Sequence, residues 1–186
     1  MRTIASNYLV QYAKGQLGRP YWYGTFGQVA NKTLYEQKKK QYPKYYTASD
    51  FSSQYGKKVH DCAGLIKGAL WCSTVDGTPT YDSAQDLSAN GFITTGCSET
   101  GNISTIPEIP GIIVWKDGHV GIYVGNGQVI EARGHAYGVV TTKLTDGRGW
   151  LKWGKVKWVS YPTPVTYTAE QAMADVKKIV EKYYGS

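Results

Sequence analysis

The spacing of apolar residues predicts helices in the first part of the chain and strands in the second. A helical period starts at Ser6, the expected N-cap, and Gly18 and Pro20 are expected to end that helix. Its apolar stripe consists of Leu9, Tyr12, Ala13 and Leu17. Residues 60–71 return to helical spacing, and Cys62 stands near the start of this second helix.

The remaining elements complete an order of helices followed by strands. Residues 82–91 are expected to form a short helix that Asp82 or Ser83 caps and Gly91 ends. From residue 111 onward, short apolar stretches alternate with turns that contain Gly, Asn and Asp. The segments expected to be extended are 111–115, 119–132, 137–144 and 155–161. Helices followed by an antiparallel meander predict the α+β class.

Two segments fall outside this pattern. Residues 31–58 are rich in Lys and Tyr and have no clean period, so we expect a surface insertion with about one helical turn. We expect one domain over residues 1–161, followed over residues 162–186 by a linker and an amphipathic helix. Thr168 and Gln171 have the spacing of a capping box at the start of this last helix.

Composition and charge narrow the class of protein. A chain of 186 residues with 41% apolar residues, 16 Tyr and 6 Trp is suited to one folded domain. The net charge of +7 favours anionic partners such as nucleic acid, anionic lipid or an anionic cell wall. No apolar run has the roughly 18 residues of a membrane span, and the start of the chain lacks the apolar stretch of a signal peptide. We therefore expect a monomer that stays in the cytoplasm until it is released, unless a signal precedes this sequence.

Of the three cysteines, Cys62 has the setting of a nucleophile. An odd number of cysteines without a CxxC pair argues against a disulfide framework and leaves at least one thiol free. At a helix start, backbone N–H groups and the helix dipole favour a thiolate and can bind an oxyanion. Cys72 and Cys97 lack this setting, and a buried structural role is the ordinary alternative for any cysteine.

A nucleophilic thiol needs a base, and the histidines are His60, His119 and His135. His60 lies two residues before Cys62 and is expected at the surface, whereas His119 opens a predicted strand. A three-residue hairpin loop would put His119 and Glu131 on one face of the sheet, directly opposite each other in one of two registers. A two-residue Asn-Gly turn would put them on opposite faces. A carboxylate beside an imidazole orients the ring and stabilises imidazolium, and an ordinary cross-strand pair is the alternative.

Three blocks of sequence, in this order, resemble the NlpC/P60 family of papain-like cysteine peptidases, which cut bacterial cell-wall peptides. GRPYWYG resembles the family's Gly-x-Pro-Tyr-x-Trp-Gly, DCAGL its Asp-Cys-Ser-Gly-Leu, and GHVGIYVGNGQVIEARG its His-bearing hairpin. The resemblance covers about residues 18–134. It implies Cys62 as nucleophile, His119 as general base and acid, and Tyr21 at the oxyanion site.

The departures from the family pattern concern the site. In the family, the third polar residue of the catalytic site is usually His. In this sequence the corresponding position is Glu131, and His135 is the alternative. Ala63 replaces the usual Ser after the nucleophile, and the Arg of the family's Pro-Arg-Thr-Ser stretch is missing from GTPTYDSAQ. The resemblance still places Asp61 and Ser83 in the oxyanion or substrate region, and the insertion is expected to rim the groove.

The resemblance implies a papain-like α+β fold with the cysteine-bearing helix packed on an antiparallel sheet or half-barrel. It implies a peptidoglycan hydrolase of the γ-D-glutamyl-diamino acid endopeptidase type, as in a phage endolysin. An N-acetylmuramoyl-L-alanine amidase with the same triad and a non-catalytic wall-binding module are the alternatives.

Partners and cofactors follow from the same comparison of motifs. The expected partner is a bacterial peptidoglycan stem peptide, with anionic wall polymers as a second. A basic and aromatic stretch, formed by Lys38, Lys39, Lys40 and the neighbouring tyrosines, resembles the surfaces that bind single-stranded nucleic acid. The preferred interpretation is a solvated rim that suits wall polymers, so no nucleic acid is expected. No cofactor is expected, and the absence of HExxH or CxxC spacing argues against a metal site.

Overall fold

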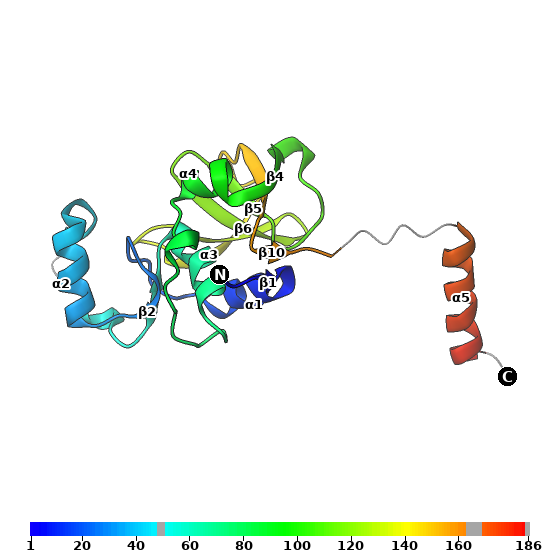
Figure 1. Cartoon of the computed structure of the whole chain (residues 1–186), viewed down its shortest axis with the longest axis horizontal. Coiled ribbons are helices and arrows are strands. Elements are labelled where there is room, and N and C mark those ends of the chain that lie inside the picture. The colour runs from blue at the N-terminus through cyan, green and yellow to red at the C-terminus, as the bar shows by residue number, and fades with distance from the viewer. Residues whose placement is uncertain (48–50, 163–168, 185–186) are drawn as a thin grey trace.

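A helix packed against an antiparallel sheet forms the centre of the structure, a computed structural model that describes residues 1–47, 51–162 and 169–184 (Figure 1). The helix is α3 (Cys62–Trp71), in which every residue after Cys62 is buried. Its many small and aliphatic side chains let both α1 (Ser6–Gly15) and the sheet pack against it. This burial holds the start of α3, and Cys62 with it, in one place.

The sheet has six strands, and all neighbouring pairs run antiparallel. In spatial order they are β4 (Cys97–Asn102), β9 (Lys152–Val156), β5 (Ile113–Lys116), β6 (His119–Gly125), β7 (Gln128–Ala132) and β8 (Val139–Lys143). Val120, Ile122 and Ile130 face the α1–α3 side, and a second cluster with Trp150 and Trp153 packs on the other side. The predicted α+β class is confirmed. The edge strand β4 was not predicted because its sequence, CSETGN, is polar.

The β6–β7 hairpin has the first of the two predicted registers. Ile122 pairs with Ile130 and Tyr123 with Val129, as a three-residue loop would give. The loop itself is the two-residue Asn126-Gly127 turn, because Gly125 pairs with Gln128, and a bulge at Val124 restores the parity that this turn would otherwise reverse. His119 and Glu131 therefore lie on the same face of the sheet. They are diagonal neighbours rather than directly opposite, because continuing this register places Glu131 across from Gly121.

The helix starts differ from the predictions in two places. In α1 the N-cap is Ala5, which makes no side-chain cap, and Ser6 is the buried first residue of the helix. Residues 82–91 do not form one helix. Asp82 caps a short turn over Ser83–Gln85, and a second turn, α4 (Ala89–Gly91), starts separately. The buried Gln85 separates them because it accepts from the Trp71 indole and donates to the Arg2 carbonyl, which holds this segment extended along the core.

The insertion contains more structure than the predicted helical turn. It is framed by a two-stranded sheet of β2 (Phe26–Val29) and β3 (Lys58–His60), with the ten-residue helix α2 (Lys32–Gln41) between them. The helix lacks an apolar period because only Tyr35 and the stem of Lys38 are buried. An aromatic cluster holds the insertion to the domain through Trp22, Ala30, Tyr35, Tyr46, Phe51 and Val59.

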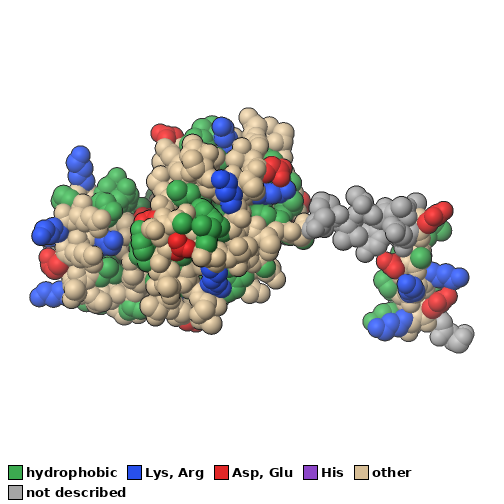
Figure 2. Space-filling view, viewed as in Figure 1, with side chains coloured by type: hydrophobic (Ala, Val, Ile, Leu, Met, Phe, Trp, Pro, Cys, Tyr) green, Lys and Arg blue, Asp and Glu red, His purple; other side chains and the backbone are tan. Residues whose placement is uncertain are grey.

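The two ends of the domain are paired. β1 (Ile4–Ala5) runs parallel to β10 (Val159–Ser160), so the start of the chain lies beside the end of the meander. The helix α5 (Ala169–Tyr184) follows, and Thr168 of the expected capping box lies outside the described residues. Within the described ranges, no helix is both long and apolar enough to cross a membrane. Figure 2 shows lysine side chains projecting from α2 and α5.

Candidate active site

The turn before α3 is held by the Asp61 carboxylate. Asp61 is the N-cap of α3: Oδ1 accepts from the Gly64 N–H at 2.5 Å and Oδ2 accepts from the Gly24 N–H at 2.8 Å. The carboxylate thus ties the aromatic loop GRPYWYG to the helix start. A β-carbon on Gly64 would lie 1.8 Å from the Thr25 carbonyl oxygen, so this approach requires glycine. The DCAGL block therefore has a structural basis at Asp61 and Gly64.

The Cys62 thiol lies at the first position of α3, beside the beginning of β6. Its sulfur is within hydrogen-bonding reach of the backbone N–H groups of Val120, Ala63 and Cys62 itself. Burial, with a smaller contribution from Asp61, raises the pKa of the Cys62 thiol to about 12, although these N–H groups act to lower it. The N–H groups thus act in the direction that the helix-start argument predicts, but burial outweighs them. Ionisation of Cys62 requires a base that accepts the proton.

His119 supplies a base beside Cys62, because it directly precedes Val120. Its Nε2 lies 2.6 Å from Glu131 Oε2. An ionised carboxylate only accepts hydrogen bonds, so Nε2 carries the proton and Nδ1 is the ring nitrogen that remains for the thiol. Glu131 is thus hydrogen-bonded to His119, as the hairpin argument predicts. The ring of His135 instead packs against Tyr21, at 5.2 Å between centroids.

The Glu131 carboxylate is fully buried and has partners on both oxygens. Oε1 accepts from Thr142 Oγ1 and from Arg148 Nε, each at 2.8 Å, and Arg148 Nη2 donates to Oε2 at 2.5 Å. Burial alone would raise the pKa of Glu131, but hydrogen bonds from His119, Arg148 and Thr142 lower it to about 2. Glu131 is therefore ionised throughout the neutral range.

The imidazole of His119 is also held from the side. It stacks on the Trp150 ring with 5.5 Å between centroids and 19° between planes. A β-carbon on Gly121 would lie 2.6 Å from Val129 Cγ1 and 3.2 Å from Trp150. The absence of a side chain at Gly121 therefore lets Trp150 pack beside the His119–Glu131 pair.

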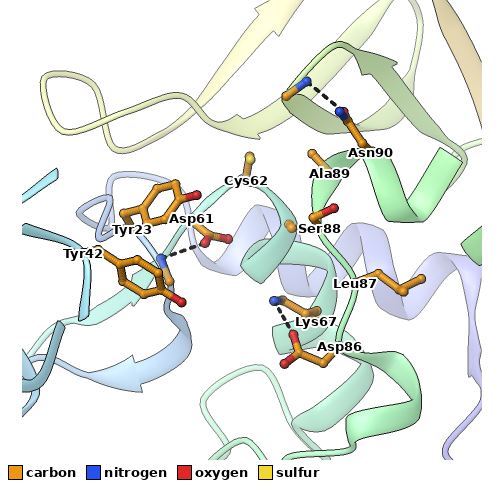
Figure 3. A pocket seen from close by; sticks show the side chains of 13 residues that line it. Tyr23, Tyr42, Asp61, Cys62, Lys67, Asp86, Leu87, Ser88, Ala89 and Asn90 are labelled. Carbon is orange, nitrogen blue, oxygen red and sulfur yellow. Dashed lines mark hydrogen bonds and ion pairs between the residues drawn. The ribbon is translucent and has the colours of Figure 1, made fainter. Parts of the chain in front are cut away.

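The turn before His119 is fastened to α4 by Asn90. Asn90 Oδ1 accepts from the Gly118 N–H at 2.8 Å, and its Nδ2 donates to Asp117 Oδ1 at 2.8 Å. Figure 3 shows Asn90 on the side of the cavity nearest this turn. His119, the first residue of β6, is thereby held in place both by the strand pairing and by the preceding turn.

Tyr21 lies close to the nucleophile. Burial raises the pKa of the Tyr21 hydroxyl, and the nearby Asp61 and Cys62 raise it further. The hydroxyl therefore stays protonated and is able to donate a hydrogen bond. This placement agrees with the oxyanion role that the resemblance implies.

His60 does not lie at the surface, so that expectation is wrong. It is fully buried on β3, and its Nε2 is 2.9 Å from the Tyr12 hydroxyl. All three residues of β3 are buried, so His60 lies inside the domain although Cys62, two residues later, lines the cavity. Burial, with the positive charges of Lys58 and Arg19, lowers the pKa of His60 to about 3.

A cavity of about 320 Å³ opens beside Cys62 (Figure 3). Tyr23 and Tyr42 form one side of it, so the insertion contributes to its wall through Tyr42. An ion pair of Lys67 and Asp86, 2.8 Å apart, lies on another side. The rest of the lining comes from Gly24, Asp61, Cys62, Ala63, Leu87, Ser88, Ala89, Asn90 and Gly118.

The structure places Ser83 away from this cavity. Ser83 lines a separate hollow with Trp71 and Tyr81, because the turn over Ser83–Gln85 follows the far end of α3. Ser88, at the start of α4, lines the Cys62 cavity instead. The predicted contact of Ser83 with substrate is therefore not supported by its position.

Three residues around Glu131 were missed by the sequence reasoning: Thr142, Arg148 and Trp150. Thr142 pairs with Val129 in the β7–β8 register, so alternation could have placed it on the Glu131 face. Arg148 and Trp150 lie in the β8–β9 connection, for which no short-range pattern gives a position. Within the described part of the chain, no group of His, Cys, Asp and Glu could hold a metal ion, and the three cysteines are free.

No protein-family model and no curated protein matches the sequence. Among solved structures, the chain is similar to the peptidoglycan hydrolase RipB from Mycobacterium tuberculosis, with 20% identity and a TM-score of 0.47 over 82% of this chain and 65% of that chain. It is similar to NlpC2 from Trichomonas vaginalis, with 17% identity and a TM-score of 0.49 over 86% of this chain and 48% of that one.

A third similar structure is the P60 domain of an antigen from Mycobacterium avium subspecies paratuberculosis, with 18% identity, a TM-score of 0.46, and coverage of 81% of this chain and 93% of that domain. The chain thus spans less than two-thirds of the RipB and NlpC2 structures. These matches are NlpC/P60 proteins, the family that the three sequence blocks resemble. At such identities and TM-scores the similarity does not assign an activity, so the functional argument depends on the site itself.

Proposed function

We propose that this chain is a cysteine hydrolase that cleaves an amide bond in peptidoglycan stem peptides, of the γ-D-glutamyl-diamino acid endopeptidase type. Cys62 is the nucleophile, His119 the general base and acid, and Glu131 the residue that orients His119. The supporting observation is the 2.6 Å hydrogen bond between His119 and Glu131 beside a helix-start thiol. Residues 1–161 would form the catalytic domain and residues 162–186 a linker and helix appended to it.

The first chemical step joins proton transfer to attack. As the Cys62 sulfur approaches the carbonyl carbon, His119 Nδ1 takes the thiol proton and the new C–S bond forms. The electron pair of the carbonyl π bond moves to its oxygen. This transfer is required because the pKa of the Cys62 thiol is about 12 before His119 accepts the proton.

The oxyanion formed in this step needs hydrogen-bond donors in fixed positions. The Cys62 and Ala63 N–H groups at the start of α3 lie near the Cys62 sulfur, and the protonated Tyr21 hydroxyl is a further donor. Asp61 keeps both in place through its bonds to Gly64 and Gly24. These donors require no rearrangement as charge develops.

Collapse of the intermediate breaks the C–N bond. The leaving amine takes the proton from His119, and the acyl group remains on Cys62 as a thioester. His119, neutral again, takes a proton from a water that attacks the thioester carbon. The C–S bond then breaks, the carboxylic acid leaves, and the departing Cys62 thiolate takes the proton back from His119. Glu131 stays ionised and holds the same ring orientation in both halves of the reaction.

The cavity provides the place for the stem peptide, and the exposed lysines of the insertion provide a second contact. Tyr23 and Tyr42 offer aromatic faces close to Cys62. Lys39 and Lys40 on α2 are exposed and suit an anionic wall polymer such as teichoic acid. Asp61 contributes to substrate binding by positioning the cavity wall.

Mass spectrometry of peptidoglycan digests tests this proposal. Purified walls are incubated with the full chain, and the soluble fragments are identified. An endopeptidase of the proposed type yields stem peptides cut after the γ-D-glutamyl residue, with the first residues still attached to muramic acid. Intact stem peptides freed from glycan would instead indicate an N-acetylmuramoyl-L-alanine amidase. Binding to walls without any release would indicate a wall-binding module and overturn the proposal.

A further inference from the structure

Arg148 joins the Glu131 carboxylate by a two-pronged contact. Its Nε and Nη2 reach Oε1 and Oε2 at 2.8 and 2.5 Å, the fork geometry in which guanidinium binds a carboxylate most strongly. The Arg148 side chain is 16% exposed and that of Glu131 is 0% exposed, so this pair is largely shielded from water. Arg148 Nη2 is also 3.5 Å from His119 Nε2, which places its charge next to the imidazole.

We propose that Arg148 is a positioning residue for His119, which holds the buried Glu131 carboxylate toward Nε2 and offsets its negative charge. This inference rests on the proposed function and concerns the same site. Arg148 belongs to none of the three sequence blocks. It acts through Glu131 and is not itself placed against the reacting atoms.

The negative charge of Glu131 explains why a positive charge at Arg148 is useful. A lone buried carboxylate against the ring would stabilise imidazolium strongly and hold the proton that must pass to the leaving amine. With Arg148 in place, the carboxylate and guanidinium together carry no net charge. Glu131 still accepts from Nε2 and keeps Nδ1 available, but its pull on the ring charge is weakened.

Four other groups bear on the charge of His119, and each comes from a different element. Cys62 lies at the start of α3 and Lys116 on β5 is the register partner of His119. Asp117 in the preceding turn is bonded to Asn90, and Trp150 covers one face of the ring. None of these four groups is hydrogen-bonded to the Glu131 carboxylate. The two bonds from Arg148 are half of the four hydrogen bonds that this carboxylate makes.

The planar fork also aligns the carboxylate. Because Nε and Nη2 bond separate oxygens, rotation of the Glu131 carboxylate would break one of them. Thr142 adds a second bond on Oε1, and Oε2 is directed at His119. A lysine at position 148 would keep the charge but not the two bonds, so the two contributions of Arg148 are separable by substitution.

The test is an NMR titration of the His119 ring in a Cys62→Ala background, which does not depend on catalysis. Arg148→Gln leaves the Glu131 charge unopposed, so the titration midpoint of His119 should move up by about one pH unit or more. Arg148→Lys should leave the midpoint close to that of the parent. Lys155→Gln is the control, because Lys155 pairs with the exposed Glu99 on the β4–β9 edge of the sheet and is expected to leave the midpoint unchanged.

Variants that also carry Glu131→Gln keep the test informative if Arg148→Gln alone fails to fold. Arg148→Gln leaves a buried carboxylate unpaired, whereas the double variant Glu131→Gln/Arg148→Gln buries two neutral amides. The midpoint should be higher in the double variant than in Glu131→Gln alone, since only the latter keeps an unpaired guanidinium beside the ring. In the active enzyme, Arg148→Lys should lower kcat about tenfold with the limb of the pH–rate profile that reports His119 unmoved.

Two results would overturn the inference. One is a folded Arg148→Gln protein whose His119 midpoint equals that of the parent. The other is an equal midpoint in Glu131→Gln and the double variant, which would reduce Arg148 to a structural role. The proposed function fails separately, if the unaltered enzyme releases no peptide from walls.

Discussion

The buried His60 makes the stability of the domain dependent on pH, and this dependence does not involve the proposed chemistry. The ring has 0% exposure and its Nδ1 has no hydrogen-bond partner in the described residues. Lys58 and Arg19 add positive charge nearby, so protonation in the folded state is unfavourable. The folded protein takes up this proton only near the His60 pKa of about 3.

The size and sign of the effect follow from the two protonation states. The unfolded chain binds a proton on His60 near its ordinary pKa of 6.5, and the folded chain does not until about 3. Between these values the unfolded state holds the extra proton, so the free energy of unfolding falls by about 1.4 kcal/mol for each pH unit lost. From pH 6.5, where the unfolded His60 is half protonated, to pH 4.5 the contribution of His60 is a loss of about 2.3 kcal/mol.

Urea denaturation of the protein and of His60→Gln at several pH values measures this contribution. Gln retains a polar group that can meet the Tyr12 hydroxyl but does not titrate. The difference between the two free energies of unfolding should change by about 1.4 kcal/mol per unit below pH 6.5. A difference that stays constant from pH 7 to 4.5 would refute the account of a neutral, buried His60.

Two further substitutions probe the site. Tyr21→Phe removes a proposed oxyanion donor and should lower kcat by about 10²-fold with little change in KM, as steady-state kinetics would show; an unchanged kcat would leave Tyr21 as a cavity wall only. Gly121→Ala introduces a carbon 2.6 Å from Val129 and 3.2 Å from Trp150. It should displace Trp150 from His119 and reduce activity at least tenfold, with altered tryptophan fluorescence, and wild-type values of both would contradict the packing described here.

Local periodicity predicted those parts of the fold in which one face of an element is buried. Alternation put His119 and Glu131 on one face because strand side chains repeat every two residues, but the parity depends on the bulge at Val124, which the sequence reasoning did not include, and not on an odd loop. The same period does not place His60, because Lys58, Val59 and His60 are all buried and the short strand before Cys62 shows no alternation. Nearness to Cys62 in sequence was the wrong guide there.

Contacts between distant segments could not be predicted in this way. Arg148 meets Glu131 across the β8–β9 connection, and no spacing rule links a loop residue to a strand two elements earlier. The helix α2 was missed because its buried residues are Tyr35, which packs on Trp22, and Lys38, so the sequence has no apolar period there. The pKa of Cys62 depends on its burial among other elements, which a helix-start argument does not include.

The central claim is that Cys62 carries the reaction, and wall hydrolysis by matched cysteine variants tests it most directly. The protein, Cys62→Ala and Cys97→Ala are assayed for release of peptide fragments from purified peptidoglycan, with circular dichroism to confirm folding. Cys62→Ala should release nothing, and Cys97→Ala, whose thiol lies on the edge strand β4, should match the unaltered protein. Hydrolysis by a folded Cys62→Ala protein, or its loss only in Cys97→Ala, would contradict the account.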